Sequence, residues 1–352
     1  MNLPFSDNLP IPKLAASFAN TSATYKFYWL IAILESVENG NGIIKKRELF
    51  SRMISNAWYT VNYFKVSFGK QDLIQNAVQQ LLQLENLTID IRKDMLLAIL
   101  ESATNPKTKQ ILYHFNKNVP HWFLSPWFPK TKNENDVEYK KRIYSSSQNF
   151  ENNSLYALYD DIITINPQWI PYLQSNARIL KDFCYWNLAL FLQSRNPNVP
   201  DLANKLIKPA VRGTLSSQRK NYWNIVFKEL GTVDCIFTNT KLSIDKFAID
   251  HFVPHAFVSH DLIWNLIPID RTFNSSKSDK LPSIDTHFDK FFELQKSAYE
   301  IVSHQNPNSK LLQDYLTIFP ALNNINDFDY SRYKECIQPL VTIAHNNGFG
   351  YL

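Results

Sequence analysis

Glycine is unusually rare in this 352-residue chain, which has 7 glycines against 24 phenylalanines, 17 tyrosines and 8 tryptophans. Few glycines leave little material for the glycine-rich loops that hold phosphate groups. Neither Gly-x-Gly-x-x-Gly nor Gly-x-x-x-x-Gly-Lys-Ser/Thr occurs, which argues against dinucleotide-binding and P-loop enzymes. The many aromatic residues instead favour a large core packed between helices, and we expect a mainly α fold.

Charge, cysteine content and hydropathy bear on the partners and the compartment of this protein. Basic residues exceed acidic ones by 37 to 32, a mild excess that is compatible with nucleic acid as a partner. The three cysteines are scattered and odd in number, which disfavours a disulfide framework. The N-terminus lacks a signal-peptide pattern, and the longest apolar run, residues 27–34, is too short to span a bilayer. We therefore expect a cytoplasmic protein without a membrane partner.

The first two thirds of the chain read mostly as helix, and we assign residues 1–230 to a helical targeting or partner domain. Apolar residues recur at helical spacing over 25–35 and 73–82. The aromatic cluster 121–128 is either a stacking platform for bases or, more commonly, a packed corner between helices. Residues 130–154 are rich in Lys, Asn, Glu and Ser and predict an exposed connection, after which helix is expected over 156–193.

A basic stretch follows at residues 202–228, which contain no acidic residue. A run of like charge is usually a solvated face, but this one leads into the segment that carries the chemistry. We therefore expect it to contact the phosphates of a nucleic acid. The predicted contact residues are Lys205, Lys208, Arg212, Arg219 and Lys220.

Residues 231–283 form a small module in which predicted strands replace the helical pattern of the preceding residues. A strand is predicted over 247–251, a second over 265–269 and a short polar helix over 272–279, with a loop containing Pro254 between the strands. This compact frame can aim the carboxylate of Asp250, the imidazole of His251 and an amide at one point. The tail, 284–352, predicts helices that pack back on the core.

This module resembles an HNH endonuclease domain of the ββα-metal class. It is especially similar to the HNH domain of the RNA-guided CRISPR nuclease, because His251, Asn265 and Asn274 are 14 and 9 residues apart and Asn274 is followed by Ser-Ser-Lys-Ser-Asp. The aromatic-rich helical N-terminal part is similar to that of a group of bacterial HNH proteins. The resemblance implies a ββα-metal fold, metal-dependent hydrolysis of phosphodiester bonds, and a role in bacterial defence or restriction with a protein partner.

The residue types agree with that chemistry. Mg²⁺, or Mn²⁺ in its place, prefers oxygen ligands and keeps several waters, so the Asp250 carboxylate and the Asn274 amide are the expected metal ligands. His251 is the expected general base, because an imidazole titrates near neutral pH. The resemblance implies that Asn265 pins the loop that orients His251. Lys277 lies one helical turn after Asn274 and is the expected phosphate ligand.

Structural zinc is not expected in this module. Many HNH domains carry two Cys-x-x-Cys pairs, but here only Cys235 remains, and Thr238 stands in the place of its partner. Asp270 and Phe273 occupy the approximate places of the second pair. One thiolate does not make a four-ligand zinc site, so we expect apolar packing to hold the frame.

DNA is the expected substrate, and two alternatives stay open. One is an RNA-cleaving toxin or defence effector on the same frame, because hydrolysis of a phosphodiester by an activated water does not need a 2′-hydroxyl. The other is a catalytically silent nucleic-acid-binding protein in which the nuclease frame is retained only as a fold.

Overall fold

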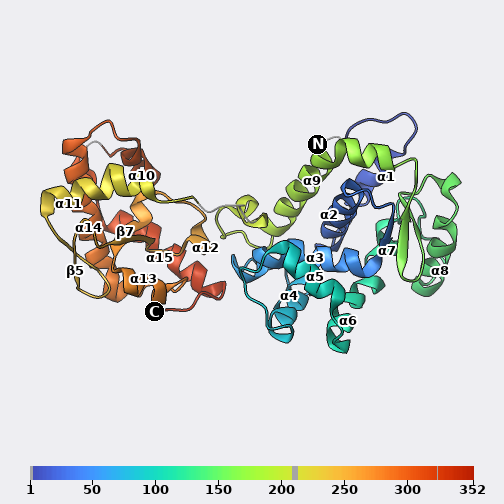
Figure 1. Cartoon of the computed structure of the whole chain (residues 1–352). Coiled ribbons are helices and arrows are strands. Elements are labelled where there is room, and N and C mark those ends of the chain that lie inside the picture. The colour runs from blue at the N-terminus through green and yellow to red at the C-terminus, as the bar shows by residue number, and fades with distance from the viewer. Residues whose placement is uncertain (1–2, 208–212, 323) are drawn as a thin grey trace. The chain divides into compact units, whose positions relative to one another are not determined.

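The protein is mainly α-helical, with a few short strands. The computed structural model describes residues 3–207, 213–322 and 324–352 (Figure 1). Contacts divide the chain into two compact units, one of Met1–Pro197 with Leu202–Lys208 and one of Asn198–Asp201 with Pro209–Leu352. The residues from 213 to 230, which the sequence analysis placed in the front domain, thus group with the nuclease-like module.

The first unit is built around α2, Tyr25–Glu38, which is buried along nearly its whole length. Residues 27–34 are all buried, so the longest apolar run of the sequence is the centre of this core. The helix ends where Gly40 takes a φ of 83°, which glycine adopts without steric cost. The other helices are α1 Ile11–Ala16, α3 Lys46–Asn62, α4 Leu73–Leu84, α5 Lys93–Ser102, α6 Pro106–Tyr113, α7 Pro120–Phe123, α8 Asp136–Ser147 and α9 Ile170–Gln193.

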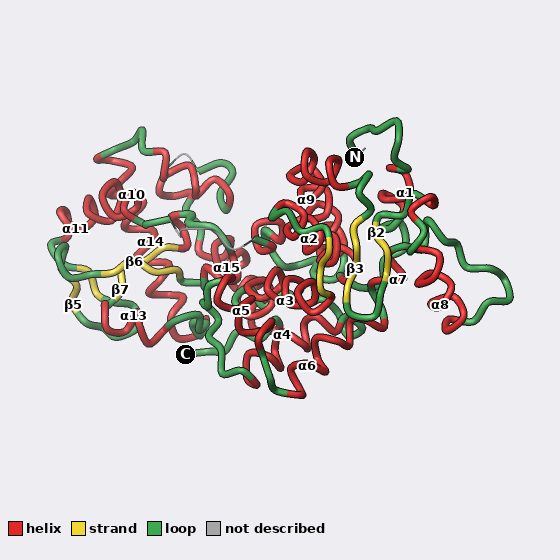
Figure 2. Tube along the Cα trace, turned by 45° about the vertical axis from the view of Figure 1, so that its right-hand side comes forward, coloured by secondary structure: helices red, strands yellow, loops and turns green. Residues whose placement is uncertain are grey.

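A three-stranded antiparallel sheet lies beside these helices (Figure 2). Its order is β1 (Ile43–Lys45), β3 (Ile162–Ile165) and β2 (Tyr156–Leu158), with Ile44 opposite Ile163. The prediction of helix from residue 156 was wrong, because helix begins only at α9. The β-branched run of β3 favours a strand, and Ile44 supplies a partner that helical periodicity cannot reveal.

The segment 130–154 was predicted as an exposed connection, and this was wrong for its central part. Helix α8 begins after Asn135, whose side chain accepts hydrogen bonds from the backbone of Val137 and Glu138 while the Glu138 carboxylate bonds back to the Asn135 N–H. This capping box starts the helix although its sequence is polar. Buried Tyr139 and Ile143 attach the helix to the core.

The aromatic cluster 121–128 is chiefly a packed corner. Phe123, Trp127 and Phe128 are buried, and the Trp127 indole N–H donates to the carbonyl of Asn153 at 2.8 Å. Trp122 is the exception among its tryptophans, because this residue is only partly buried, with its ring centroid 5.1 Å from that of Tyr139.

In the second unit, two helices cover the nuclease-like module. Phe291 of α14 (Ile284–Gln305) stacks on Phe252 with ring centroids 4.0 Å apart, and Gln295 donates to the carbonyl of Leu266. Tyr333 of α15 (Tyr330–Asn346) bonds to the carbonyl of Trp264. The remaining helices and strands are α10 Ser216–Gln218, α11 Asn224–Leu230, β4 Val233–Asp234, β5 Lys241–Leu242, β6 Ala248–His251, α12 His255–Val258, β7 Leu266–Ile269 and α13 Arg271–Lys277.

Two smaller points concern the helices. Residues 310–317, within the tail for which helices were predicted, form a 3₁₀ helix. Within the part of the chain that the structure describes, no helix combines the length and the apolar character needed to cross a membrane.

Candidate active site

The site is built on one antiparallel strand pair. β6 and β7 pair with Asp250 opposite Ile267 and His251 opposite Leu266. Successive side chains of a strand point to opposite faces, so the side chains of Asp250 and His251 leave β6 in opposite directions. The strands and the helix α13 fall within two residues of the bounds that the sequence predicts.

Helix α13 brings a third group to the strands. It begins after Asp270, whose carboxylate accepts a hydrogen bond from the Phe273 N–H at 2.9 Å. Asn274 and Lys277 are one turn apart and therefore share a face of the helix. Lys277 contacts β6, so this shared face is the one directed at the site.

Asp250 and Lys277 form a buried ion pair. The Lys277 ammonium donates to Asp250 Oδ2 at 2.7 Å and to the carbonyl of His251 at 2.9 Å, and its side chain is 0% exposed. Burial by itself would raise the pKa of Asp250, but its interactions with His251 and Lys277 outweigh this effect and lower the pKa to about 2. The carboxylate is therefore ionised at neutral pH and available as an oxygen ligand.

The His251 imidazole is fully enclosed and has a defined tautomer. Its Nε2 lies 2.9 Å from Asp261 Oδ1 and 3.2 Å from the carbonyl oxygen of His260. Both neighbours are acceptors, so Nε2 carries the proton and Nδ1 is the basic nitrogen of the neutral ring. Nδ1 is 3.8 Å from Asp250 Oδ1 and, among the described residues, is a buried nitrogen without a hydrogen-bond partner.

Two carboxylates also set the basicity of this ring. Burial would lower the pKa of His251, but interactions with Asp250 and Asp261 outweigh it and raise the pKa above the usual value for histidine. The geometry thus provides one ring nitrogen held by protein acceptors and one aimed at the side where Asp250 lies. That arrangement suits a general base whose orientation is fixed.

Asn265 closes the loop between the two strands. Its Oδ1 accepts from the Val253 N–H and its Nδ2 donates to the Val253 carbonyl, both at 2.8 Å, and the side chain is completely buried. The Asn265 carbonyl also accepts from the Phe252 N–H at 2.7 Å. These bonds fix the two residues that directly follow His251.

The predicted phosphate ligands lie in different environments. Lys277 belongs to the site, as described above. Lys205 is fully buried, and Arg219 donates to the carbonyls of Phe247 and Ile244 while its guanidinium stacks 3.7 Å from the Phe247 ring centroid. Lys220 is exposed, whereas Lys208 and Arg212 lie outside the described residues.

The prediction of a phosphate contact is wrong for Lys205, because its side chain is buried and has no access to a ligand. The partly buried Arg219 bonds to the backbone of its own unit, and for this residue and Lys220 the phosphate contact stays a prediction. Sequence alone does not distinguish such structural cations from solvated ones.

Asp261 is the site residue that the sequence analysis missed. It lies ten residues after His251 in an irregular loop, so no periodicity links the two. The available signal was chemical: an enclosed imidazole needs an acceptor for its second nitrogen, and Asp261 is the acidic residue of the loop that leads back to β7.

Aromatic packing fills the place where many HNH domains carry zinc ligands. Phe273 stacks on Phe237 with centroids 5.3 Å apart, and Phe237 stacks on Phe252 at 6.5 Å. Cys235 is buried in the tight turn between β4 and β5, where its N–H donates to the Thr240 carbonyl. The absence of structural zinc stays a prediction, for which this packing supplies a physical basis.

The donor set suits a hard cation with few protein ligands. Among the described residues, no group of three or more His, Cys, Asp or Glu side chains could hold a metal ion. Asp250 and Asn274 offer oxygen atoms, and Mg²⁺ is commonly bound through one or two protein groups together with water and phosphate oxygens. The residues present therefore fit Mg²⁺, and the Asn274 side chain is partly exposed to solvent.

Comparison with known families agrees with this geometry. Residues 235–283 match the family model described as HNH endonuclease. The chain therefore contains an HNH endonuclease domain, a class of nuclease domain that acts on nucleic acid and generally uses divalent metal ions. No curated protein and no solved structure matched the chain.

Proposed function

We propose that this protein is a Mg²⁺-dependent endonuclease that hydrolyses phosphodiester bonds in DNA, with His251 as the general base. The observation that carries the proposal is the pair of acceptors at Nε2 of His251, from which the tautomer of the ring follows. Its Nε2 faces two acceptors, which leaves Nδ1 as a basic nitrogen beside the ionised Asp250. An imidazole held in this way can take a proton from a water that attacks phosphorus.

The other residues have positioning and binding roles in this proposal. Asp261 orients the ring, and Asn265 fixes the backbone that follows it. Asp250 and Asn274 would hold Mg²⁺, which supplies Lewis-acid polarisation of the phosphoryl oxygen and stabilises the leaving 3′ oxygen. Lys277 pairs with Asp250, and in this proposal its charge would also attract the phosphate through space.

The resemblance of the module extends the proposal to a biological setting. Under it, the helical unit selects the target or a protein partner, and the protein works in the bacterial cytoplasm in defence or restriction. The HNH match supports nucleic acid as the substrate class. DNA in particular is part of this proposal.

The substrate and metal are tested together. Wild type and Asp250→Ala are incubated with matched plasmid DNA, linear DNA and RNA, each in Mg²⁺, Mn²⁺ or EDTA. We expect DNA cleavage by wild type in Mg²⁺ and none by the variant or in EDTA. Cleavage of RNA alone would replace DNA by RNA as the substrate. Nucleic-acid binding without cleavage in either metal would refute the proposed endonuclease activity.

A further inference from the structure

The net positive charge of the chain resides in the helical unit. Residues 1–197 and 202–208 carry 23 Lys and Arg against 16 Asp and Glu, a formal charge of +7. The remaining residues, which include the HNH domain, carry 14 against 16, a charge of −2. Because nucleic acid is a polyanion, the unit with the net positive charge is the one that attracts it by its overall charge.

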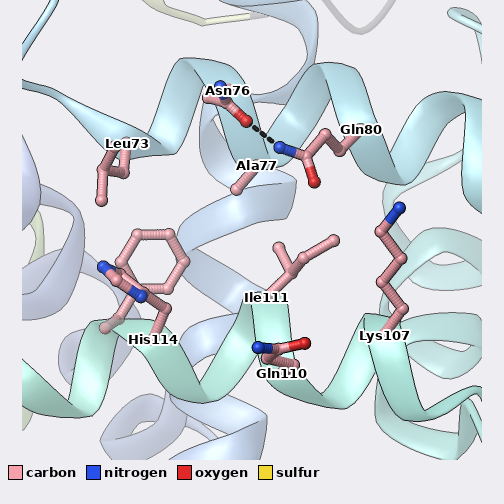
Figure 3. A pocket seen from close by; sticks show the side chains of 9 residues that line it. Leu73, Asn76, Ala77, Gln80, Lys107, Gln110, Ile111 and His114 are labelled. Carbon is pink, nitrogen blue, oxygen red and sulfur yellow. Dashed lines mark hydrogen bonds between the residues drawn. The ribbon is translucent and has the colours of Figure 1, made fainter.

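That unit has a groove between α4 and α6. Figure 3 shows Asn76 and Gln80 of α4 on one side, facing Lys107 and Gln110 of α6 and His114, which directly follows α6, on the other. Asn76 and Gln80 are hydrogen-bonded to each other, which orders the amide row on the α4 side. The floor is apolar and includes Phe115, which is buried.

The groove continues beyond Leu73, which lines both this hollow and the next one along the surface. The second hollow is lined by Tyr25, Lys26 and Trp122. Tyr25 packs edge-on against Phe115 with centroids 5.7 Å apart, and its hydroxyl accepts from the Leu73 N–H, so the junction of the two hollows is rigid. Trp122 is the partly exposed member of the aromatic cluster 121–128.

The chemistry of the lining indicates what kind of molecule fits. Among the described residues that line these hollows, none is Asp or Glu, while Lys26 and Lys107 carry positive charge. Amide side chains offer donors and acceptors together, which matches the edges of nucleobases. Partly exposed aromatic rings accept the faces of unstacked bases, and a groove of this composition is typical of single-strand binding.

We propose that this groove binds single-stranded DNA, with a base stacked on Trp122 and phosphates near Lys26 and Lys107. The bases of a duplex are stacked on one another, so their faces are not available to the ring of Trp122. A single strand has unstacked bases and can therefore stack one of them on Trp122. The identity of the ligand rests on the proposed function, whereas the site itself rests on the groove.

The test is a binding titration with a labelled mixed-sequence oligonucleotide, performed on the full chain carrying His251→Ala so that no strand is cut. Single-stranded DNA should bind more tightly than the matching duplex and the matching RNA. Trp122→Ala should weaken binding about tenfold, as loss of one stacked base does, while Trp122→Phe should retain most of the affinity. Lys26→Ala with Lys107→Ala should reduce the salt slope of log affinity by about 1.4, for two phosphate contacts.

Two matched controls should bind as the parent does. Lys109→Ala removes a charge from α6 two residues from Lys107, and Trp186→Ala removes an exposed tryptophan from α9; neither residue lines the groove. Circular dichroism verifies that each variant is folded. Groove variants that bind like these controls, or tighter binding of duplex or RNA, would overturn the proposal. If the wild-type protein nicks plasmid but the groove does not bind single-stranded DNA, only the groove proposal is refuted. If the groove binds single-stranded DNA but the wild-type protein does not nick plasmid, only the proposed endonuclease activity is refuted.

Discussion

At the scale of single residues, the proposed catalysis depends on which nitrogen of His251 is basic. The ring is enclosed, and the acceptors at Nε2 leave Nδ1 to take a proton. Asp261 is therefore a positioning residue, which acts on the reaction through the His251 ring. Its substitution tests the orientation of that ring without removing a residue of the core.

Asp261→Asn should lower kcat about 10- to 100-fold, the usual effect of removing a carboxylate that orients a functional histidine. The amide can present an N–H to Nε2, which would favour the tautomer with a protonated Nδ1. Asp261 also helps to raise the pKa of His251, so the acidic limb of the pH–rate profile should move to lower pH in the variant. Asp245→Asn, in the exposed turn before β6, is the control. An unchanged profile would contradict the role.

The ion pair of Asp250 with Lys277 predicts a pH-dependent stability. The folded pKa of Asp250 is lowered to about 2, below that of an unfolded aspartate, so its stabilisation is present above about pH 4 and lost as the pH falls toward 2. In buffer without divalent metal, Asp250→Asn should be less stable than wild type by about 2 kcal/mol at pH 6. The difference should shrink in calorimetric scans as the pH falls to 3. A constant difference would contradict the lowered pKa.

At the scale of elements, the strand pair and α13 were predictable because their signals are local. Asp270 caps the helix, and turn residues separate the strands. The errors have non-local causes. Strand β3 pairs with β1, which is remote in sequence, as well as with β2, and Lys205 and Arg219 contact residues far along the chain. Asp250, His251 and Asn265 were predictable by their pattern, whereas Asp261 was not.

The loop between β6 and β7 depends on the Asn265 amide. Asn265→Ala would leave the N–H and carbonyl of Val253 buried without these partners, and loss of such bonds costs about 1–3 kcal/mol for each group. The melting temperature of the second unit should fall clearly, and kcat should fall with little change in KM. Asn221→Ala removes an exposed amide of the same unit and should leave both quantities unchanged.

The phenylalanine stack predicts a module that needs no zinc for its fold. Addition of EDTA should leave the melting temperature unchanged, because the Phe237–Phe273 contact packs this part of the module without a metal ion. Phe273→Ala should lower the melting temperature, since it removes this packing, and added zinc should not restore it. A fall in melting temperature on chelation of wild type would contradict this interpretation.

At the scale of the whole molecule, charge and chemistry are divided between two units. The helical unit carries the positive charge and the groove, while the unit with the HNH domain is slightly acidic. The scarcity of glycine agrees with the proposed site, because a metal ion and side chains would contact the phosphate there instead of a glycine-rich loop.

Plasmid nicking measures whether His251 is the base of an active endonuclease. Wild type and His251→Ala are compared at equal concentration in Mg²⁺, after circular dichroism has verified that both are folded. Wild type should convert supercoiled plasmid to nicked or linear forms, and the variant should be slower by about 10²- to 10⁴-fold, the contribution of general base catalysis. Equal rates for the two proteins would contradict the account.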